Sequence, residues 1–415
     1  MKTKLLLFIV LNLPLISFSQ TLNCSEKESE FEKSIESKDY TKANEIWLQI
    51  KISCANFSEK NFILGTKLLN YNLQTSFKDS KINAARELIK LYDLYDKNFP
   101  NNSNGNFEKR ALALIASNSV NEQEINNLLE KAFKFQQKSF SNPEALNLYF
   151  KYYFNKYKDG KSGVSFDLMM ENFNEFLILL DKNSNTYPEN KSEYNLVKES
   201  TTSLLSGVLS CDNLVPYVQK NFESKKENIN WLTTFTNLMS ENCNKNPFLE
   251  TILLQLFKIK PSSIVASKLS DYYINNNENL SIKYGNDAVE LESNPIEKSI
   301  FAFKIASIYV NLDTEKTNEA IKIAIKNDPK NGRYFLFLSN LYINSIPKCA
   351  STENEIKAIY VLASNTVLKA GEVESMYKNM ALKLSDDYLK KANIQNSMHN
   401  KSVKIGCWIN ETITF

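Results

Sequence analysis

Glycine and proline are scarce in this chain, and their scarcity constrains the fold more than any other feature. The 415 residues include only 9 glycines and 10 prolines, whereas average usage is about 7% and about 5%. Sandwiches, barrels and doubly wound folds need many glycine-containing turns, and phosphate-binding loops need glycine as well. A chain with so few turn-forming residues has few sharp turns and long uninterrupted helices. The composition therefore predicts an all-α protein.

Three similar octets recur in the C-terminal half of the chain. They are KLSDYYIN at Lys268–Asn275, KIASIYVN at Lys304–Asn311 and FLSNLYIN at Phe337–Asn344, and their last tyrosines are 36 and 33 residues apart. Each octet has a large apolar residue, then a small one, then a tyrosine three positions on, all on one helical stripe. The small residue lets a second helix approach closely. Prolines recur at intervals of 34 residues and are expected in the connections between hairpins: Pro261, Pro295 and Pro329.

This pattern resembles the tetratricopeptide repeat (TPR), a helix–turn–helix unit of 34 residues. Leu-Gly/Ala-x-x-Tyr marks its first helix, and small residues mark its second. A separate match lies near the N-terminus, where Lys38–Ile50 resembles a second helix with Ala43 at the small position. Leu64-Gly65-x-x-Leu68 follows in register and resembles the next first helix. Segments of other exported bacterial proteins of this architecture are similar to Cys211–Pro216, Trp231–Cys243 and Ile405–Ile409.

The resemblance implies an all-α fold in which helix–turn–helix repeats stack as a TPR-like α-solenoid. Between the two matching regions, helices are expected without a definite repeat register: Lys81–Asn98, Glu122–Gln137, Pro143–Tyr157 and Phe166–Leu180. The predicted order is a signal peptide, N-terminal helical repeats, middle helical hairpins, C-terminal TPR-like repeats and a strand-like tail. These cover residues 1–19, 20–158, 164–260, 261–400 and 401–415.

The C-terminal tail has a pattern of its own. Val403, Ile405, Cys407 and Ile409 alternate with period two, which is typical of a strand. The tail is interpreted as a cap that shields the last repeat. The alternative is a strand that adds to the edge of a partner's sheet.

The first twenty residues have the pattern of a cleaved signal peptide. Lys2 and Lys4 precede the apolar stretch Leu5–Phe18, and cleavage is expected near Ser19-Gln20. The stretch is too short to span a bilayer, which needs about 20 residues. A buried core helix is one alternative. Lipidation of Cys24 is another, and it is less favoured because Asn23 stands where a lipobox needs a small residue. The chain is therefore expected to be exported, to the periplasm, the cell envelope or the medium, with no transmembrane segment.

The net charge argues against nucleic acid as a partner. Removing residues 1–19 takes away two lysines and no acid, so the formal charge falls from +3 to +1. A near-neutral chain lacks the basic footprint that nucleic-acid binding requires. Lysines and glutamates alternate along the sequence, which is the usual pattern of solvated helix faces.

Six cysteines are an even number, and export would place them in an oxidising compartment. Disulfides are therefore favoured over buried free thiols. Six cysteines allow 15 pairings, and the spacings narrow them because each repeat of a solenoid contacts only its neighbours. The expected pairs are Cys24–Cys54, Cys211–Cys243 and Cys349–Cys407.

No catalytic residue, cofactor-binding residue or metal ligand is predicted. The chain has one histidine, His399, with no nucleophile in a recognisable frame beside it. Asp159–Gly163 (DGKSG) lacks the earlier glycine of a phosphate-binding loop, because position 155 is Asn155. An aromatic stripe on one helix is interpreted as interhelical packing and, less favoured, as a glycan platform: Tyr149, Tyr152, Tyr153, Phe154 and Tyr157.

Stacked hairpins form a curved solenoid whose concave face is the usual binding surface. Mapped onto the three octets, the concave positions of the TPR are Ile264, Ser267, Asp271, Ile274, Ile300, Phe303, Ser307, Val310, Arg333, Leu336, Asn340 and Ile343. This surface is mixed apolar and polar with little charge. The hypothesis is a non-enzymatic scaffold that binds a protein or peptide segment in this groove. The alternatives are a glycan-binding accessory protein of the envelope and an enzyme of unrecognised type.

Overall fold

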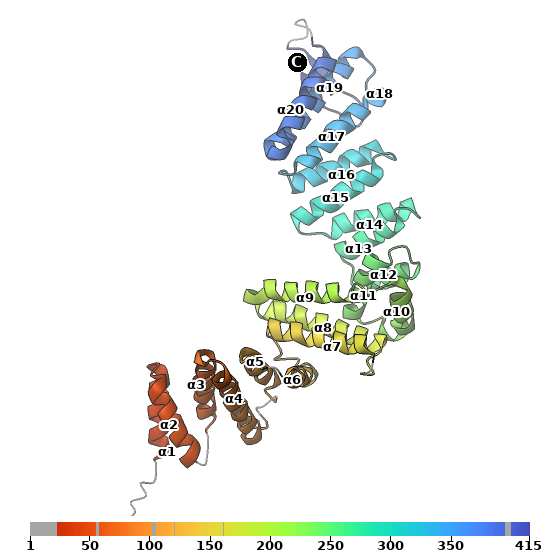
Figure 1. The fold of residues 1–415 in the computed structure, drawn as a ribbon. Helices are drawn as coiled ribbons and strands as arrows, with labels where there is room; N and C mark the ends of the chain where they lie inside the picture. Colours follow the sequence, from red (N-terminus) through yellow and green to blue (C-terminus); the bar gives the residue numbers. More distant parts are fainter. Residues whose placement is uncertain (1–22, 55–57, 102–104, 120, 161, 395–399) are drawn as a thin grey trace, which may run out of the picture. The chain divides into compact units, whose positions relative to one another are not determined.

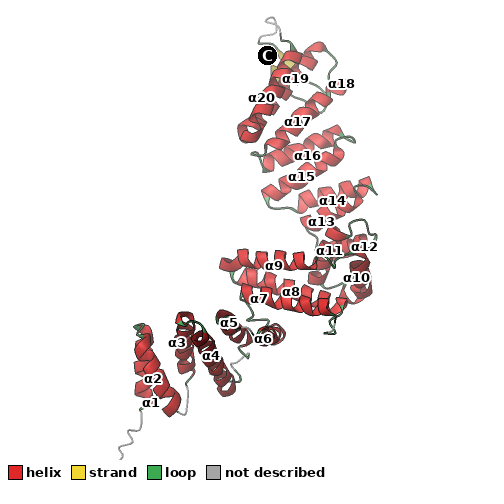
Figure 2. Cartoon of the chain, viewed as in Figure 1, coloured by secondary structure: helices red, strands yellow, loops and turns green. Residues whose placement is uncertain are grey.

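The structure is a computed structural model that describes residues 23–54, 58–101, 105–119, 121–160, 162–394 and 400–415. The predicted signal peptide, Lys161 and His399 lie outside the described residues. The described part of the chain folds into α-helices joined by short turns, with two strands near its C-terminal end (Figures 1 and 2). The all-α prediction is confirmed.

The chain divides into two compact units, and the boundary falls between Leu204 and Leu205. The first unit contains nine helices among its described residues: α1 (Cys24–Glu36), α2 (Tyr40–Ser53), α3 (Glu59–Thr75), α4 (Asp79–Asn98), α5 (Phe107–Ala116), α6 (Glu122–Phe135), α7 (Pro143–Asp159), α8 (Phe166–Thr186) and α9 (Lys191–Leu205), with the 3-10 turn η1 (Pro188–Asn190) before α9. Helices α1/α2, α3/α4 and α5/α6 pack as hairpins.

The second unit contains α10 (Cys211–Lys225), α11 (Ile229–Asn242), α12 (Phe248–Ile259), α13 (Ser263–Tyr273), α14 (Glu278–Leu291), α15 (Pro295–Tyr309), α16 (Thr314–Asn327), α17 (Gly332–Asn344), α18 (Ile346–Cys349), α19 (Glu353–Val373), η2 (Ser375–Tyr377), α20 (Lys378–Ala392), β1 (Ser402–Lys404) and β2 (Thr412–Thr414). Helices α13/α14, α15/α16 and α17/α19 form successive hairpins, and α20 packs against α19. These hairpins are stacked in chain order, as the repeat pattern predicts (Figure 1).

The octets form the first helices of these hairpins. Their small residues, Ser270, Ala306 and Ser339, are at most 1% exposed, and their tyrosines, Tyr273, Tyr309 and Tyr342, are also buried. Ser270 donates its hydroxyl hydrogen to the carbonyl of Ser281 on α14, over 2.8 Å. Such a bond requires the backbones of the two helices to lie close together. A small side chain at this position allows that approach. Pro261 and Pro329 lie between helices as predicted, whereas Pro295 is the first residue of α15.

Asparagine and aspartate define many of the helix starts. Asn142, Asn228, Asn277 and Asp313 are N-caps of α7, α11, α14 and α16, and each side chain accepts a hydrogen bond from a backbone N–H in the first turn. Such caps satisfy donors that a helix end would otherwise leave unpaired. They explain how a chain with few glycines and prolines still ends and restarts its helices at defined residues.

The two helices that the N-terminal resemblance predicts are present as α2 and α3. Ala43 is fully buried on α2, and Leu68 is fully buried on α3. Gly65 lies directly against the indole of Trp47, and a Cβ added there would be 2.4 Å from the ring. The glycine therefore lets α3 approach α2, as the small position of the motif requires.

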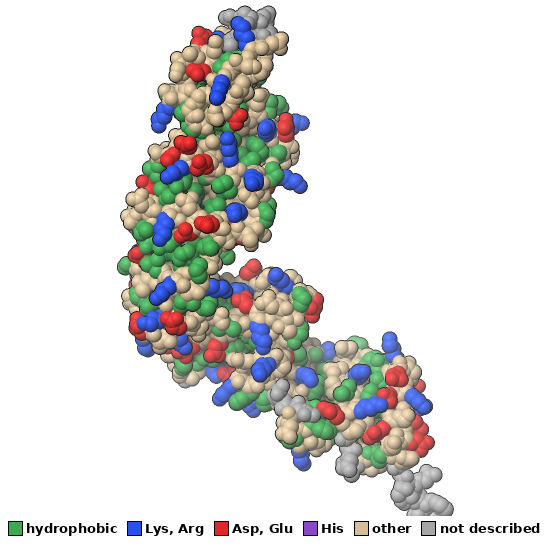
Figure 3. All heavy atoms as spheres, turned by 180° about the vertical axis from the view of Figure 1, so that it is seen from behind, with side chains coloured by type: hydrophobic (Ala, Val, Ile, Leu, Met, Phe, Trp, Pro, Cys, Tyr) green, Lys and Arg blue, Asp and Glu red, His purple; other side chains and the backbone are tan. Residues whose placement is uncertain are grey.

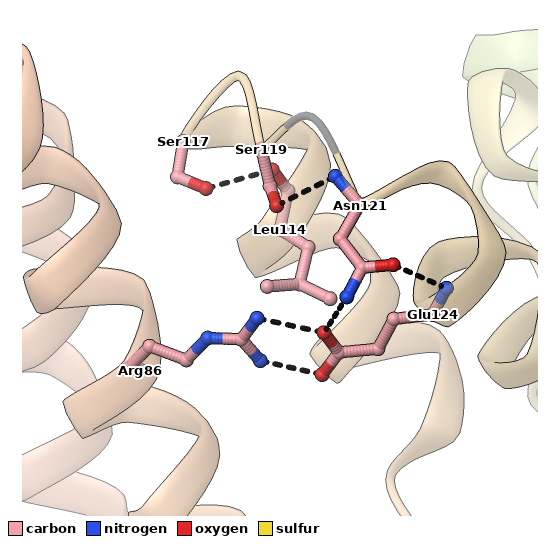
Figure 4. A network of polar contacts seen from close by, with 6 residues as sticks. All are labelled: Arg86, Leu114, Ser117, Ser119, Asn121 and Glu124. Atoms are coloured by element: carbon pink, nitrogen blue, oxygen red, sulfur yellow. Dashed lines mark hydrogen bonds and ion pairs between the residues drawn. The ribbon is translucent and has the colours of Figure 1, made fainter.

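A polar network joins the second and third hairpins of the first unit (Figure 4). The Arg86 guanidinium on α4 donates to both carboxylate oxygens of Glu124 on α6, over 2.5 and 2.7 Å. Asn121, the N-cap of α6, donates its amide to the same carboxylate over 3.1 Å. Arg86 lowers the pKa of Glu124 chiefly through the hydrogen bond. A bidentate pair of this kind fixes both distance and orientation.

The C-terminal tail is a hairpin and not one continuous strand. Strand β1 ends at Lys404 and pairs antiparallel with β2, with Val403 opposite Ile413. The expectation that period-two strand geometry continues through Cys407 and Ile409 is wrong, because Cys407 has a φ of 62° and lies in the turn. Ile405 and Ile409 are nevertheless buried at 0% and 2% exposure. The strands lie against α19.

Three pairs of cysteine sulfurs lie at bonding distance in the described residues. The Sγ atoms are 2.08 Å apart in Cys24–Cys54, 2.28 Å in Cys211–Cys243 and 2.23 Å in Cys349–Cys407. The structure therefore brings together the same pairs that the sequence spacing favours. Each pair lies within one unit, and the last ties the C-terminal hairpin to the end of α18.

Candidate functional site

The twelve residues mapped from the TPR concave face all lie on or directly after three first helices of the second unit, α13, α15 and α17. We call these twelve positions the first-helix face. None of them belongs to the buried core. Three of its apolar side chains are widely exposed: Ile264 at 61%, Ile274 at 45% and Ile300 at 48%. Asp271, Ser307, Arg333 and Asn340 are exposed as well.

Other members of the face are less available. Val310, Leu336 and Ile343 are partly buried and pack against the hydrophobic core. Their side chains therefore contribute to the stability of the hairpins as well as to the surface. The exposed part of the face consists of three isoleucines contributed by α13 and α15, together with polar or charged side chains on all three helices.

A lysine that the sequence analysis did not single out links α13 to α15. Lys304 Nζ donates to the carbonyl oxygen of Ser267 over 3.1 Å and to its hydroxyl oxygen over 2.9 Å. The same ammonium lies 2.5 Å from the carboxylate of Asp271. Two predicted face residues are thus brought together by a residue at the first position of the second octet. The sequence contained a signal for this residue, because the first octet also begins with a lysine, Lys268.

Aromatic contacts link α15 to α17. The guanidinium of Arg333 lies over the ring of Phe303, with 4.8 Å between its central carbon and the ring centroid. Phe303 and Phe337 pack edge to face at 5.3 Å. A guanidinium held over an aromatic ring is attracted to its negative face. The first-helix face is therefore continuous from α13 to α17.

A polar cavity of about 650 Å³ lies at the α13 end of this face. It is lined from α11, α12 and α13, and it includes Asp271 together with Lys268 and Glu241. Burial lowers the pKa of Lys268, while the carboxylates of Glu241 and Asp271 act in the opposite direction. The half-buried ammonium and its acidic neighbours give this cavity nearly balanced charge.

A second cavity, of about 670 Å³, lies in the first unit between α6, α7 and α8. Residues of the aromatic stripe take different places around it. Tyr149 is 2% exposed and Phe154 is 5% exposed, so both belong to the core. Tyr153 is half-buried and lines the cavity, whereas Tyr152 is half-buried outside it. Sequence reasoning did not find this cavity, because its walls come from three helices of unassigned register.

The described residues contain no group of three or more His, Cys, Asp or Glu side chains placed to hold a metal ion. No helix within the described ranges is both long enough and apolar enough to cross a membrane. Charges of both signs are interspersed over the described surface drawn in Figure 3, without a broad patch of one sign.

Comparisons with known proteins give similarity at the level of structure. No family model and no curated protein matches the chain. Among solved structures, the apo form of the quorum sensor NprR from B. thuringiensis is similar at 14% identity, covering 88% of this chain and 98% of its own, with a TM-score of 0.22. A circular tandem repeat protein with a novel repeat topology is similar at 8% identity, covering 89% of this chain and 88% of its own, with a TM-score of 0.24. At these TM-scores neither likeness assigns a role to any residue, and the fold rests on the helices described above.

Proposed function

We propose that this chain is a non-enzymatic, exported TPR-like scaffold that binds an extended protein or peptide segment on its first-helix face. The observation that carries the proposal is the exposure of Ile264, Ile274 and Ile300 on successive linked helices. Apolar side chains exposed in a row, beside polar groups that can pair with a peptide main chain, are typical of a protein-binding surface.

The electrostatics favour a partner of little net charge. Lys304 and Asp271 neutralise each other, and the positive charge of Arg333 lies over Phe303. A strongly acidic or basic segment would therefore meet no complementary patch on this face. The affinity would come mainly from apolar side chains of the partner that pack against the exposed isoleucines.

Export and cell-envelope location form the second part of the proposal. Three cysteine pairs at bonding distance support an oxidising compartment. The signal-peptide pattern of residues 1–19 supports export, with cleavage near Ser19-Gln20. The division into N-terminal repeats (20–158), middle hairpins (164–260) and C-terminal TPR-like repeats (261–400) is a further part of the proposal.

The test is selection of displayed peptides on the purified chain from Gln20 to Phe415. We expect enriched peptides with spaced apolar residues, bound by the native protein with saturation. The double variant Ile264→Asp, Ile300→Asp should weaken their binding by about tenfold or more, because both changes place a charge where apolar contact is needed.

Leu291→Asp is the matched control, because Leu291 is 45% exposed on α14, a second helix of the same unit. Its binding should equal that of the native protein. The proposal fails if no peptide is enriched, or if the control variant weakens binding as much as the double variant does.

A further inference from the structure

The cavity between α6, α7 and α8 has the size and lining of a small-molecule site. Its volume of about 670 Å³ lies within the range of about 300–1,000 Å³ usual for such sites. The walls come from α6 from Asn127 onward, from Gln137 after its end, and from α7 and α8. These three helices pack in sequence within the first unit (Figure 1). Nothing in the first-helix face, which belongs to the other unit, involves these residues.

The floor of the cavity is a rigid aromatic stack. The rings of Phe133 on α6 and Tyr149 on α7 are parallel within 17°, with centroids 4.4 Å apart. The amide of Asn172 on α8 donates to the Tyr149 hydroxyl over 2.5 Å. The ring of Tyr153, one turn further along α7, has its centroid 6.1 Å from that of Tyr149 and is half-buried at the cavity wall. Two accessible aromatic rings therefore line the cavity: that of Tyr153 on this buried base, and that of Phe135, which is 61% exposed.

Charged groups of both signs surround this floor. Glu130 and Glu175 line the cavity together with Lys131 and Lys134. The carboxylate of Glu130 already lies 2.7 Å from the ammonium of Lys156. Burial raises the pKa of the Tyr153 phenol above its usual value. Because the four lining charges include two of each sign, a charged ligand would meet no patch of a single sign here.

Hydrogen-bonding groups are nevertheless dense along the rim. The exposed side chains of Asn127, Gln137 and Glu175 supply amide donors, amide acceptors and a carboxylate beside the aromatic wall. A purely apolar ligand would desolvate these groups without pairing them, which costs free energy. A neutral ligand with one C–H face and a rim of hydroxyls would satisfy both the ring and the polar rim. A pyranose sugar has that form.

We propose that this cavity is a binding site for a neutral saccharide, one face of which packs on the ring of Tyr153 while its hydroxyls pair with Glu175 and the amides of Asn127 and Gln137. The site is independent of the peptide-binding function proposed for the second unit. The first unit would then recognise a carbohydrate through non-covalent contacts alone.

The test is isothermal titration of the full exported chain with neutral trisaccharides: chitotriose, maltotriose and cellotriose. We expect saturable binding of at least one of them. Tyr153→Ala should weaken that binding by about tenfold or more, and Glu175→Gln by a smaller factor, because one removes the stacking surface and the other one charged acceptor. Tyr153→Phe keeps the ring and should stay within about threefold of the native affinity.

Tyr152→Ala is the matched control, because Tyr152 is a half-buried tyrosine on the same helix that does not line the cavity. It should bind the sugar as the native chain does. The absence of saturable heat with all three sugars would overturn the proposal, and so would equal losses in the Tyr152 and Tyr153 variants. Tyr153→Phe provides a test that does not depend on removing the ring, which could unfold the first unit. If this variant is folded and has lost all binding, the proposal is also overturned. The double variant at Ile264 and Ile300 should leave sugar binding unchanged, which separates this site from the first-helix face.

Discussion

Gly285 shows how a single residue sets the spacing of two helices. It lies on α14, and a Cβ added there would be 2.0 Å from Cδ1 and 2.7 Å from Cγ1 of Ile305 on α15. Ile305 is 2% exposed and belongs to the hydrophobic core of the second unit. The close approach of α14 and α15 therefore depends on the missing side chain.

We expect Gly285→Ala to destabilise the second unit, although alanine usually favours a helix over glycine by about 1 kcal/mol. Overpacking a well-filled core costs about 1–3 kcal/mol, which outweighs that gain. Urea unfolding followed by circular dichroism measures the change in the free energy of unfolding.

Gly207→Ala serves as the comparison for this prediction, because no heavy atom lies within 4 Å of the Cβ that it adds. Its free energy of unfolding should stay within about 0.5 kcal/mol of the native value. If Gly285→Ala is as stable as Gly207→Ala, the close approach does not limit packing.

At the scale of helices, the Arg86–Glu124 pair predicts a pH dependence. Arg86 lowers the pKa of Glu124 in the folded state. The stabilisation is therefore present above the unfolded pKa of about 4.3 and is lost as pH falls through the lower folded value. Glu124→Gln should destabilise the first unit by about 0.2–1 kcal/mol at pH 7, the usual contribution of a partly exposed pair. The difference from the native chain should vanish at acidic pH, where Glu124 is protonated in both states.

Glu122→Gln isolates the effect of the pair from that of the helix dipole. Glu122 lies in the same first turn of α6 and has no ion-pair partner among the described residues. Its pH dependence, measured by urea unfolding at both pH values, is subtracted from that of Glu124→Gln. A remaining difference that is the same at pH 7 and at acidic pH would contradict the prediction.

The C-terminal hairpin makes a second prediction at this scale. Ile405 is fully buried between the hairpin and the helices, and the ring of Trp408 stacks on Tyr342 at 5.6 Å. Ile405→Ala should lower the stability of the second unit by about 2–4 kcal/mol, because it removes buried methyl groups and leaves a cavity. Val403→Ala, at a half-buried position of β1, should cost about 1 kcal/mol or less. Equal costs in thermal unfolding would show that the tail does not act as a cap.

The elements that could be predicted from sequence are those whose packing residues lie close together in the sequence. Ser270, Tyr273 and the large apolar residue of their octet lie within five consecutive residues. One octet therefore contains all the residues that predict the contact between two helices. In the first unit, α8 runs from Phe166 to Thr186, longer than the predicted Phe166–Leu180. Helices of such unequal length have no common period, so their register could not be read. In the tail, the period-two pattern of apolar residues continues past Cys407, although the chain turns there. The pattern does not reveal that Cys407 has a positive φ.

The candidate sites divide in the same way. The first-helix face follows from the repeat, because equivalent positions on successive helices are neighbours in any such stack. The link through Lys304 and the cavity beside Tyr153 depend on side chains from helices far apart in sequence. Asn127 and Glu175 belong to no common sequence motif, so their proximity could not be predicted from the sequence.

At the scale of the whole molecule, the three cysteine pairs give each compact unit its own covalent link. Cys24–Cys54 lies in the first unit, and Cys211–Cys243 and Cys349–Cys407 lie in the second. The links close separations of 30, 32 and 58 residues. In the chain-entropy view each such link stabilises its unit by about 3–4 kcal/mol through restriction of the unfolded chain.

Proteolysis and mass spectrometry without reductant should therefore find these three linked peptide pairs in protein recovered after export. Reduction should lower the thermal unfolding temperature of both units, because both lose a link. The same chain, produced without residues 1–19 in a reducing cytosol and alkylated at once, supplies the control with six free thiols. Three or more free thiols in the exported protein would contradict the pairing and would remove its support for an oxidising compartment. Linked pairs together with an unchanged unfolding temperature on reduction would instead show that the helices alone hold each unit, so that the cysteines mark where the chain resides and contribute little to its stability.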